Sequence, residues 1–183
     1  MRRVVMILGL VAVLISGCSS HRAMTDRMDA SKSLVFGYID MDDSPAKELT
    51  AFTLKQVLPK TDAPYFNMRT FEGVFYVENL PPGSYQFYRF GGPGGFFSSA
   101  SFYWFNFPTQ TEGVRISRST LQYLGSFKYK KTGSFFNEKF DIEPIQSPGE
   151  REAIEKILQY SSGTQWEALL LKRLDQLGGR RKQ

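Results

Sequence analysis

The stretch Gly73-Val74-Phe75-Tyr76-Val77-Glu78-Asn79-Leu80-Pro81-Pro82-Gly83-Ser84-Tyr85-Gln86-Phe87 predicts two β-strands joined by a turn. Aromatic and β-branched residues, which favour strands, stand at both of its ends. Between them, Pro82 presets the φ angle of a turn and Gly83 accepts a positive φ without steric cost. The stretch therefore predicts a strand, a tight turn and a returning strand in a mainly β protein.

Strand-forming segments and turn residues alternate on both sides of this stretch, from Ser33 to Pro144. Seven or eight short strands at such spacing are typical of a β-sandwich or a barrel. A glycine-rich run at Gly91–Gly95 is predicted to be a loop, because glycine and proline interrupt regular structure. The predicted strands are Leu34–Met41, Leu49–Leu58, Phe71–Val77, Ser84–Phe90, Ser101–Phe107, Gly113–Ile116, Leu121–Tyr129 and Lys139–Ile142.

The opening stretch resembles the G-x-F-x-x-x-N-L-P-P-G-x-Y hairpin of carboxypeptidase-regulatory-like and transthyretin-like domains. Small bacterial lipoproteins that carry such a domain also resemble the chain at Tyr123–Phe127. The resemblance implies an immunoglobulin-like, prealbumin-like antiparallel β-sandwich over residues 33–144. It further implies a domain that binds or supports other molecules and is not an enzyme.

Residues 145–183 switch to a helical period. Ser147-Pro148-Gly149-Glu150 and Thr164-Gln165-Trp166-Glu167 both have the pattern of a capping box, which starts a helix. Each is followed by apolar residues three or four apart, and Gly163 and Gly178 stand where the helices would end. The sequence predicts a helical hairpin that packs on the sheet, followed by a basic tail. Docking of the hairpin on a partner is the alternative.

The N-terminus has the features of a secretory signal. Arg2 and Arg3 precede the apolar run Val4–Ile15, which is too short to span a bilayer core that needs about 20 residues. Ile15-Ser16-Gly17-Cys18 resembles the lipobox of bacterial lipoproteins. The resemblance implies that Cys18 is lipidated, that residues 1–17 are removed and that residues 18–32 form a flexible tether. Ser19, in place of Asp, favours sorting to the outer membrane, facing the periplasm.

The composition excludes several kinds of chemistry. The chain has 183 residues with one Cys and one His, too few for an intramolecular disulfide or a four-ligand zinc site. The single histidine, His21, lies in the predicted tether, where a catalytic base would lack a rigid setting. Removal of residues 1–17 leaves 21 basic and 18 acidic side chains, too small an excess to indicate nucleic-acid binding. We expect no enzyme activity, cofactor or metal.

Aromatic residues concentrate in one part of the chain, because residues 85–107 hold 11 of the 27. In the strand Ser101–Phe107, Phe102 and Trp104 point one way and Tyr103 and Phe105 the other. Both faces are therefore apolar, so either both are covered, for example by the helical hairpin, or one is a binding surface. The candidate binding residues are Phe102, Tyr103, Trp104 and Phe105. Stacked aromatic rings suit sugars, acyl chains or a protein partner.

A basic stretch follows at Arg115, Arg118, Lys128, Lys130 and Lys131, which predicts a solvated strand face or a patch for anionic glycans or headgroups. Together these features predict a lipid-anchored, non-enzymatic binding or structural accessory of the bacterial cell envelope, with a protein or glycan partner. The alternative is a glycan- or lipid-binding module that uses the aromatic strand around Trp104.

Overall fold

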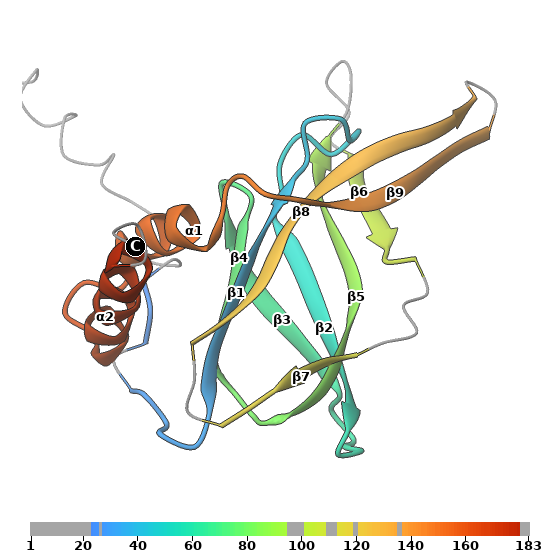
Figure 1. Ribbon diagram of the computed structural model, residues 1–183. Helices are drawn as coiled ribbons and strands as arrows, with labels where there is room; N and C mark the ends of the chain where they lie inside the picture. Colours follow the sequence, from blue (N-terminus) through green and yellow to red (C-terminus); the bar gives the residue numbers. More distant parts are fainter. Residues whose placement is uncertain are drawn as a thin grey trace, which may run out of the picture.

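The computed structural model describes residues 23–25, 27–94, 101–108, 113–118, 121–134 and 137–179. These residues form nine strands followed by two helices (Figure 1). The strands are β1 (Ser33–Asp40), β2 (Ala51–Leu58), β3 (Tyr65–Phe71), β4 (Val74–Leu80), β5 (Gly83–Gly94), β6 (Ser101–Asn106), β7 (Val114–Ile116), β8 (Leu121–Ser134) and β9 (Asn137–Ile145), and the helices are α1 (Glu150–Leu158) and α2 (Gln165–Gly179).

All the strands belong to one strongly curled sheet, and the predicted two-sheet sandwich is wrong. Eight strands follow the order β6-β5-β2-β3-β4-β1-β8-β9, and β7 pairs with β5. Figure 1 shows how this sheet curves into a half-barrel. The sheet is also mixed rather than antiparallel throughout, because β1 and β8 run parallel.

The sandwich prediction fails because the sequence pattern did not reveal strand β3. Residues 71–77 look like one strand, but Glu72 and Gly73 both have positive φ, at 45° and 79°, and make a tight turn. The turn separates β3 from β4, which pair with each other from Phe71 and Val74 outward. Since β3 also pairs with β2, it joins what would have been two sheets into one.

The quoted stretch 73–87 is a corner, not the predicted hairpin. Strand β4 pairs with β1 and β3, whereas β5 pairs with β2, β6 and β7. The Tyr85 hydroxyl donates a hydrogen bond of 2.7 Å to the carbonyl of Pro81 and fixes the corner. Gly83 passes so close to β2 that a Cβ there would lie 2.4 Å from the carbonyl oxygen of Leu58. The Pro-Pro-Gly segment therefore carries the chain across the end of the sheet.

The predicted loop at Gly91–Gly95 is also wrong over its described part, because β5 continues to Gly94 and pairs there with β6. The backbone of residues 45–50 crosses this end of β5 at very short range. A Cβ on Gly92 would lie 1.7 Å from the carbonyl oxygen of Glu48, and one on Gly94 would lie 2.0 Å from that of Pro45. The glycines make this approach possible and do not break the strand.

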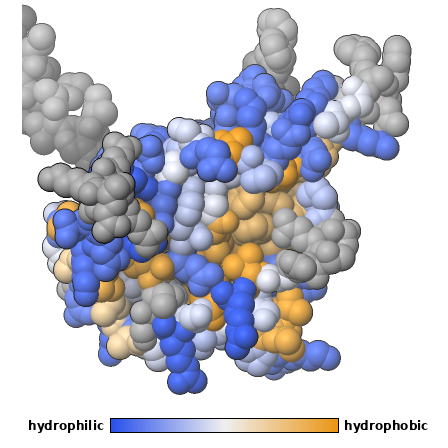
Figure 2. Space-filling view, in the orientation of Figure 1, coloured by the Kyte–Doolittle hydropathy of each residue, from blue (hydrophilic) through white to orange (hydrophobic). Residues whose placement is uncertain are grey.

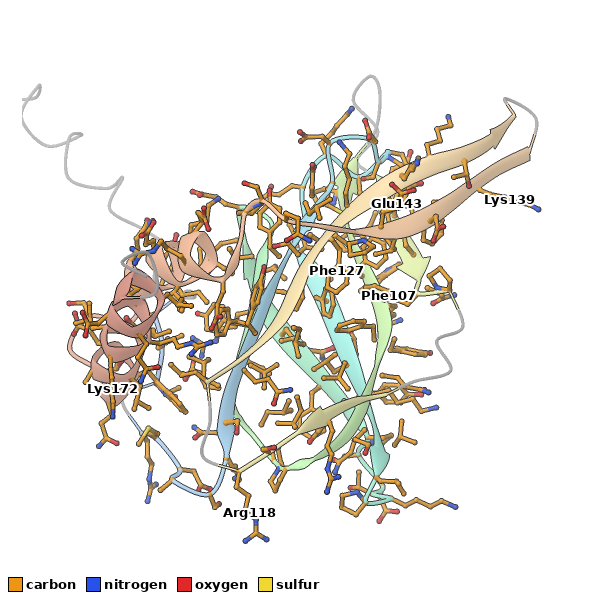
Figure 3. All side chains as sticks on the ribbon, in the orientation of Figure 1. Phe107, Arg118, Phe127, Lys139, Glu143 and Lys172 are labelled. Carbon is orange, nitrogen blue, oxygen red and sulfur yellow. The ribbon has the colours of Figure 1, made fainter. Side chains whose placement is uncertain are left out.

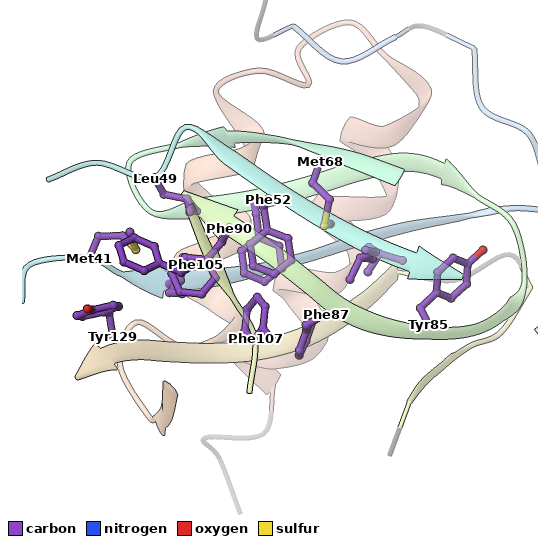
Figure 4. Packing of buried hydrophobic residues seen from close by; sticks show 14 of the residues in the cluster. Met41, Leu49, Phe52, Met68, Tyr85, Phe87, Phe90, Phe105, Phe107 and Tyr129 are labelled. Atoms are coloured by element: carbon purple, nitrogen blue, oxygen red, sulfur yellow. The ribbon is translucent and has the colours of Figure 1, made fainter. Parts of the chain in front are cut away.

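The concave side of the sheet is filled by the main hydrophobic core, in which aromatic rings predominate (Figure 4). Phe52 stacks on Phe75 with ring centres 3.9 Å apart. Where the half-barrel opens between β8 and β5, apolar side chains gather at the surface (Figure 2), and Phe107 and Phe127 lie there (Figure 3). Both rings pack on Phe87, at 5.0 and 5.4 Å between centres. Packed aromatic rings thus line this opening.

The two helices cover part of the convex side, and the predicted packing of the helical hairpin on the sheet is confirmed. A second core forms under them. Its fully or nearly fully buried members are Leu34, Phe36, Phe71, Val74 and Tyr76 from the sheet, and Ala153, Ile154, Ile157, Trp166 and Leu170 from the helices. Helix α1 begins at Glu150, where the Gly149 amide donates to the Glu152 carboxylate at 3.0 Å.

The described part of the predicted tether lies against the body rather than apart from it. The Met24 amide donates to the carbonyl of Tyr160 at 2.8 Å, in the loop between the helices. The Thr25 amide donates to Glu78 of β4 at 2.8 Å, and the Asp29 amide donates to the Asn79 side chain at 2.7 Å. Residues 23–25 and 27–32 thus extend the cover of the convex side from the helices across β4.

Candidate functional site

Strands β2, β3, β5 and β6 present the part of the convex face on which large aromatic side chains are exposed. In β6, Phe102 and Trp104 are 47% and 49% exposed, whereas Phe105 is 8% exposed and belongs to the main core. Tyr103 is half-buried and packs on that core. The predicted alternation of the strand is confirmed, but of the four candidate residues only Phe102 and Trp104 lie on the exposed face.

A β-bulge adds two consecutive residues of β5 to this face. The register between β2 and β5 shifts between Thr53 and Leu54, where Tyr88 is the extra residue. As a result Phe87 and Phe90 both enter the core, while Tyr88 is 37% exposed and Arg89 is half-buried. The pattern Phe87-Tyr88-Arg89-Phe90, with two residues between core aromatics instead of one, is the sequence signal of this bulge.

The exposed side chains form a continuous row across the sheet, which we call the aromatic row (Phe102, Trp104, Arg89, Tyr88, Tyr65 and Lys55). Phe102 and Trp104 have ring centres 4.8 Å apart. The guanidinium carbon of Arg89 lies over the ring of Trp104 at 4.3 Å and over that of Tyr88 at 5.7 Å from its centre.

The row continues from β5 to β3 above the intervening strand β2. The Tyr88 and Tyr65 rings lie 4.9 Å apart, and Tyr65 is 48% exposed. The Lys55 ammonium lies 5.9 Å from the centre of the Tyr65 ring. Because neighbouring strands are about 4.8 Å apart, the row spans roughly 14 Å from β6 to β3. The predicted binding residues do not include Tyr65, Tyr88, Arg89 or Lys55, which come from three different strands.

Glycine and polar residues shape the surroundings of the row. Gly91 pairs with Trp104 across the sheet, and the Phe102 ring lies 3.1 Å from where a Cβ of Gly91 would be, so this ring covers bare backbone. Asn106 pairs with Arg89 and is exposed, and Asn67, two residues from Tyr65, is exposed as well. The Asn67 side-chain oxygen accepts a hydrogen bond of 3.0 Å from the Thr53 hydroxyl. Aromatic faces with amide groups beside them can stack on a ligand and bond to its polar edge.

The predicted basic stretch does not form one patch. Arg115 lies on β7. Arg118 lies near one end of the half-barrel, and the β8–β9 hairpin, which carries Lys139 and Glu143, lies at the opposite end (Figure 3). Lys130 of β8 pairs with Glu143 at 2.6 Å. Lys128 contacts Asp43 and Asp40 at 3.2 and 3.5 Å, and its bonding to the first and charge attraction to the second raise its pKa. Lys128 and Lys130 therefore balance neighbouring acids.

Other predicted sites are not assembled by the part of the chain that the structure describes. The lipobox residues Ile15, Ser16, Gly17 and Cys18 lie outside the described residues, as does His21. Within the described ranges, no group of three Asp, Glu, Cys or His residues is arranged to hold a metal ion. Searching those ranges also finds no helix with the length and apolarity needed to span a membrane.

Comparison with known proteins returns no match: no family model, no curated protein and no solved structure resembles this chain at a significant level.

Proposed function

We propose that this protein is a non-enzymatic binding protein of the bacterial cell envelope that binds an extended glycan along the aromatic row. The observation that carries the proposal is the uninterrupted series Phe102, Trp104, Arg89, Tyr88 and Tyr65. It lies on a part of the sheet face that neither the helices nor residues 23–25 and 27–32 cover. Exposed aromatic residues that lie side by side mark interaction sites on soluble domains.

The shape of the row favours a linear sugar polymer over other ligands. A sugar ring has an apolar C–H face that stacks on an aromatic ring and a polar rim that needs hydrogen bonds. The row supplies rings over roughly 14 Å, with the amides of Asn106 and Asn67 beside them. An acyl chain has no polar rim and would gain nothing from the amides.

Anchoring at Cys18 is part of the proposal, supported by the lipobox-like sequence. Two acyl chains on one residue make membrane attachment stable. Because residues 23–25 and 27–32 lie against the body, only residues 18–22 separate the anchor from the described domain. Five residues reach at most roughly 18 Å. The domain would thus be held near the membrane surface rather than on a long tether.

Native gel electrophoresis through soluble polysaccharides tests glycan binding. The full-length protein in detergent is run in gels that contain dextran, hydroxyethylcellulose or polygalacturonate, beside Trp104→Ala and Tyr65→Ala variants. We expect at least one polysaccharide to retard the protein and each variant to bind about tenfold more weakly, since each loses one stacking face.

Leu171→Ala is the matched control, because Leu171 is an apolar side chain of α2 that is 51% exposed and remote from the row. It should bind as the unaltered protein does, and circular dichroism should show that all variants are folded. Lack of retardation by every polysaccharide, or equal binding by Trp104→Ala and Leu171→Ala, would refute glycan binding at this row.

Metabolic labelling with palmitate tests the anchor separately. Cells that express the protein should incorporate label into it and retain it in the membrane fraction, and Cys18→Ser should abolish both. A Cys18→Ser protein that still carries label would show that Cys18 is not the attachment site.

A further inference from the structure

The charged residues in the strands that carry the aromatic row are all basic. Strands β2, β3, β5 and β6 contain no Asp or Glu, although the chain has 18 acidic residues, and they contain Lys55, Arg69 and Arg89. The only acid of the adjoining strand β4 is Glu78. The charged residues of these four strands are thus all basic, whereas the chain as a whole mixes 23 basic with 18 acidic residues.

Arg69 is the one of these cations whose charge is already balanced. Its guanidinium lies 3.4 Å from the Glu78 carboxylate and also donates to the carbonyl of Ala23. These contacts hold the N-terminal segment against β3 and β4. Arg69 therefore serves the fold and is not available to a ligand on the row.

Arg89 and Lys55 have no acidic partner among the described residues, and both lie in the row itself. Arg89 lies over the rings of Trp104 and Tyr88, and its Nε is buried without a hydrogen-bond partner in the described structure. A guanidinium stays charged at any physiological pH, and contact with aromatic rings replaces part of its hydration. The row thus holds a partly desolvated charge beside the most exposed ring of β5 and β6.

We propose that the aromatic row selects a negatively charged glycan, whose acid groups Arg89 and Lys55 neutralise while its rings stack on Trp104 and Tyr65. This inference rests on the proposed function and names its ligand class. The two cations lie beside different rings, Arg89 next to Trp104 and Lys55 next to Tyr65, so each can meet the acid group of a different sugar. The planar guanidinium can donate two parallel hydrogen bonds to a carboxylate or a sulfate, which are stronger than bonds between neutral groups.

A pair of polymers that differ only in charge tests the inference. Binding of the full-length protein in detergent is measured at low salt to polygalacturonate and to the same polymer with its carboxylates converted to methyl esters. We expect about tenfold tighter binding to the charged form, since hydrogen bonds to charged groups stabilise more than neutral ones. The difference should shrink at about 1 M salt, where the Debye length falls to about 3 Å.

Charge-removing variants locate the effect. Arg89→Gln and Lys55→Gln should lose most of the preference for the charged polymer, whereas Lys172→Gln, the same change on an exposed lysine of α2, should keep it. A parallel comparison of dextran sulfate with dextran distinguishes sulfate esters from carboxylates as the acid group. Preference for either charged polymer that depends on Arg89 supports the inference.

Different results would contradict charge selection and glycan binding. Equal binding of the charged and esterified polymers would overturn charge selection and leave glycan binding standing, as would an equal effect of Lys172→Gln and Arg89→Gln. Failure of every polymer to bind would overturn the proposed function and this inference with it. Binding to anionic phospholipid vesicles that requires Arg89, without binding to any polysaccharide, would reassign the row to a membrane surface.

Discussion

The guanidinium carbon of Arg89 lies 4.3 Å from the centre of the Trp104 ring, on the uncovered convex face of the sheet. The two residues come from adjacent strands, and a β-bulge at Tyr88 turns Arg89 and Tyr88 outward together. A cation over an exposed indole is worth about 0.5–1 kcal/mol, which is a modest contribution to folding. The arrangement therefore has more consequence for binding than for stability.

The two tryptophans are expected to differ strongly in accessibility to a quencher. Trp104 is 49% exposed and Trp166 is 1% exposed under the helices. In Trp166→Phe, the fluorescence of Trp104 should be quenched readily by acrylamide, and a glycan that stacks on it should protect it. In Trp104→Phe, the emission of Trp166 should lie at shorter wavelength and resist quenching. Equal quenching of the two variants would contradict the assignment of inner and outer faces.

The crossing of residues 45–50 over β5 predicts that Gly92 tolerates no side chain. A Cβ would lie 1.7 Å from the carbonyl oxygen of Glu48, so Gly92→Ala must displace backbone. We expect a loss of about 1–3 kcal/mol or more in the free energy of unfolding, measured by urea denaturation. Gly149→Ala is the comparison, because its nearest neighbour is the flexible Glu152 carboxylate at 3.2 Å. It should cost less than about 1 kcal/mol, and a similar loss in both variants would argue against the crossing.

The second core predicts that the helices stabilise the sheet. Ile157 is fully buried between α1 and the strands, so Ile157→Ala should reduce the free energy of unfolding by about 2–5 kcal/mol. Leu171→Ala, on the exposed side of α2, should change it by no more than about 0.5 kcal/mol. If Ile157→Ala were as mild as Leu171→Ala in urea denaturation, the helices would not be packed on the convex face.

Stability is expected to fall in alkaline solution because Tyr76 and Tyr85 are fully buried and Tyr38 and Tyr123 are half-buried. Burial raises the pKa of Tyr85 to about 12, and it also raises the pKa values of Tyr38, Tyr76 and Tyr123. In the unfolded chain a tyrosine ionises near pH 10. A raised pKa in the folded state means that the contribution of Tyr85 is complete below about pH 10 and is lost as the pH rises to about 12.

Urea denaturation at about pH 9 and about pH 11 measures this effect. Tyr85→Phe removes the hydrogen bond to the Pro81 carbonyl and should cost about 0.5–1.5 kcal/mol at neutral pH. Its stability should then fall less between the two alkaline values than that of the unaltered protein. An identical fall in both proteins would show that Tyr85 does not contribute to the alkaline loss.

Local patterns predicted most of the strands and both helices, and they failed where pairing is decided over longer distances. The alternation of Phe102, Tyr103 and Trp104 gave the correct faces of β6. The pattern did not separate β3 from β4, because Glu72-Gly73 makes a turn inside what looks like one strand. Of the four candidate binding residues, Phe102 and Trp104 lie on the exposed face. Arg89 and Tyr65 reach the same row only through strand order.

The sequence by itself determined the local elements of the fold: strands from a period of two and helices from a period of 3.6. It also contains the lipobox-like N-terminus, whose lipidation palmitate labelling tests. What only the tertiary structure decided is how these elements are joined and covered. The strand β3 unites the strands into one curled sheet, and the helices with residues 23–25 and 27–32 cover only part of its convex face. Strand pairing and coverage depend on contacts between residues far apart in the chain, which a local pattern does not contain. The exposed row from Trp104 to Tyr65 is a product of those contacts.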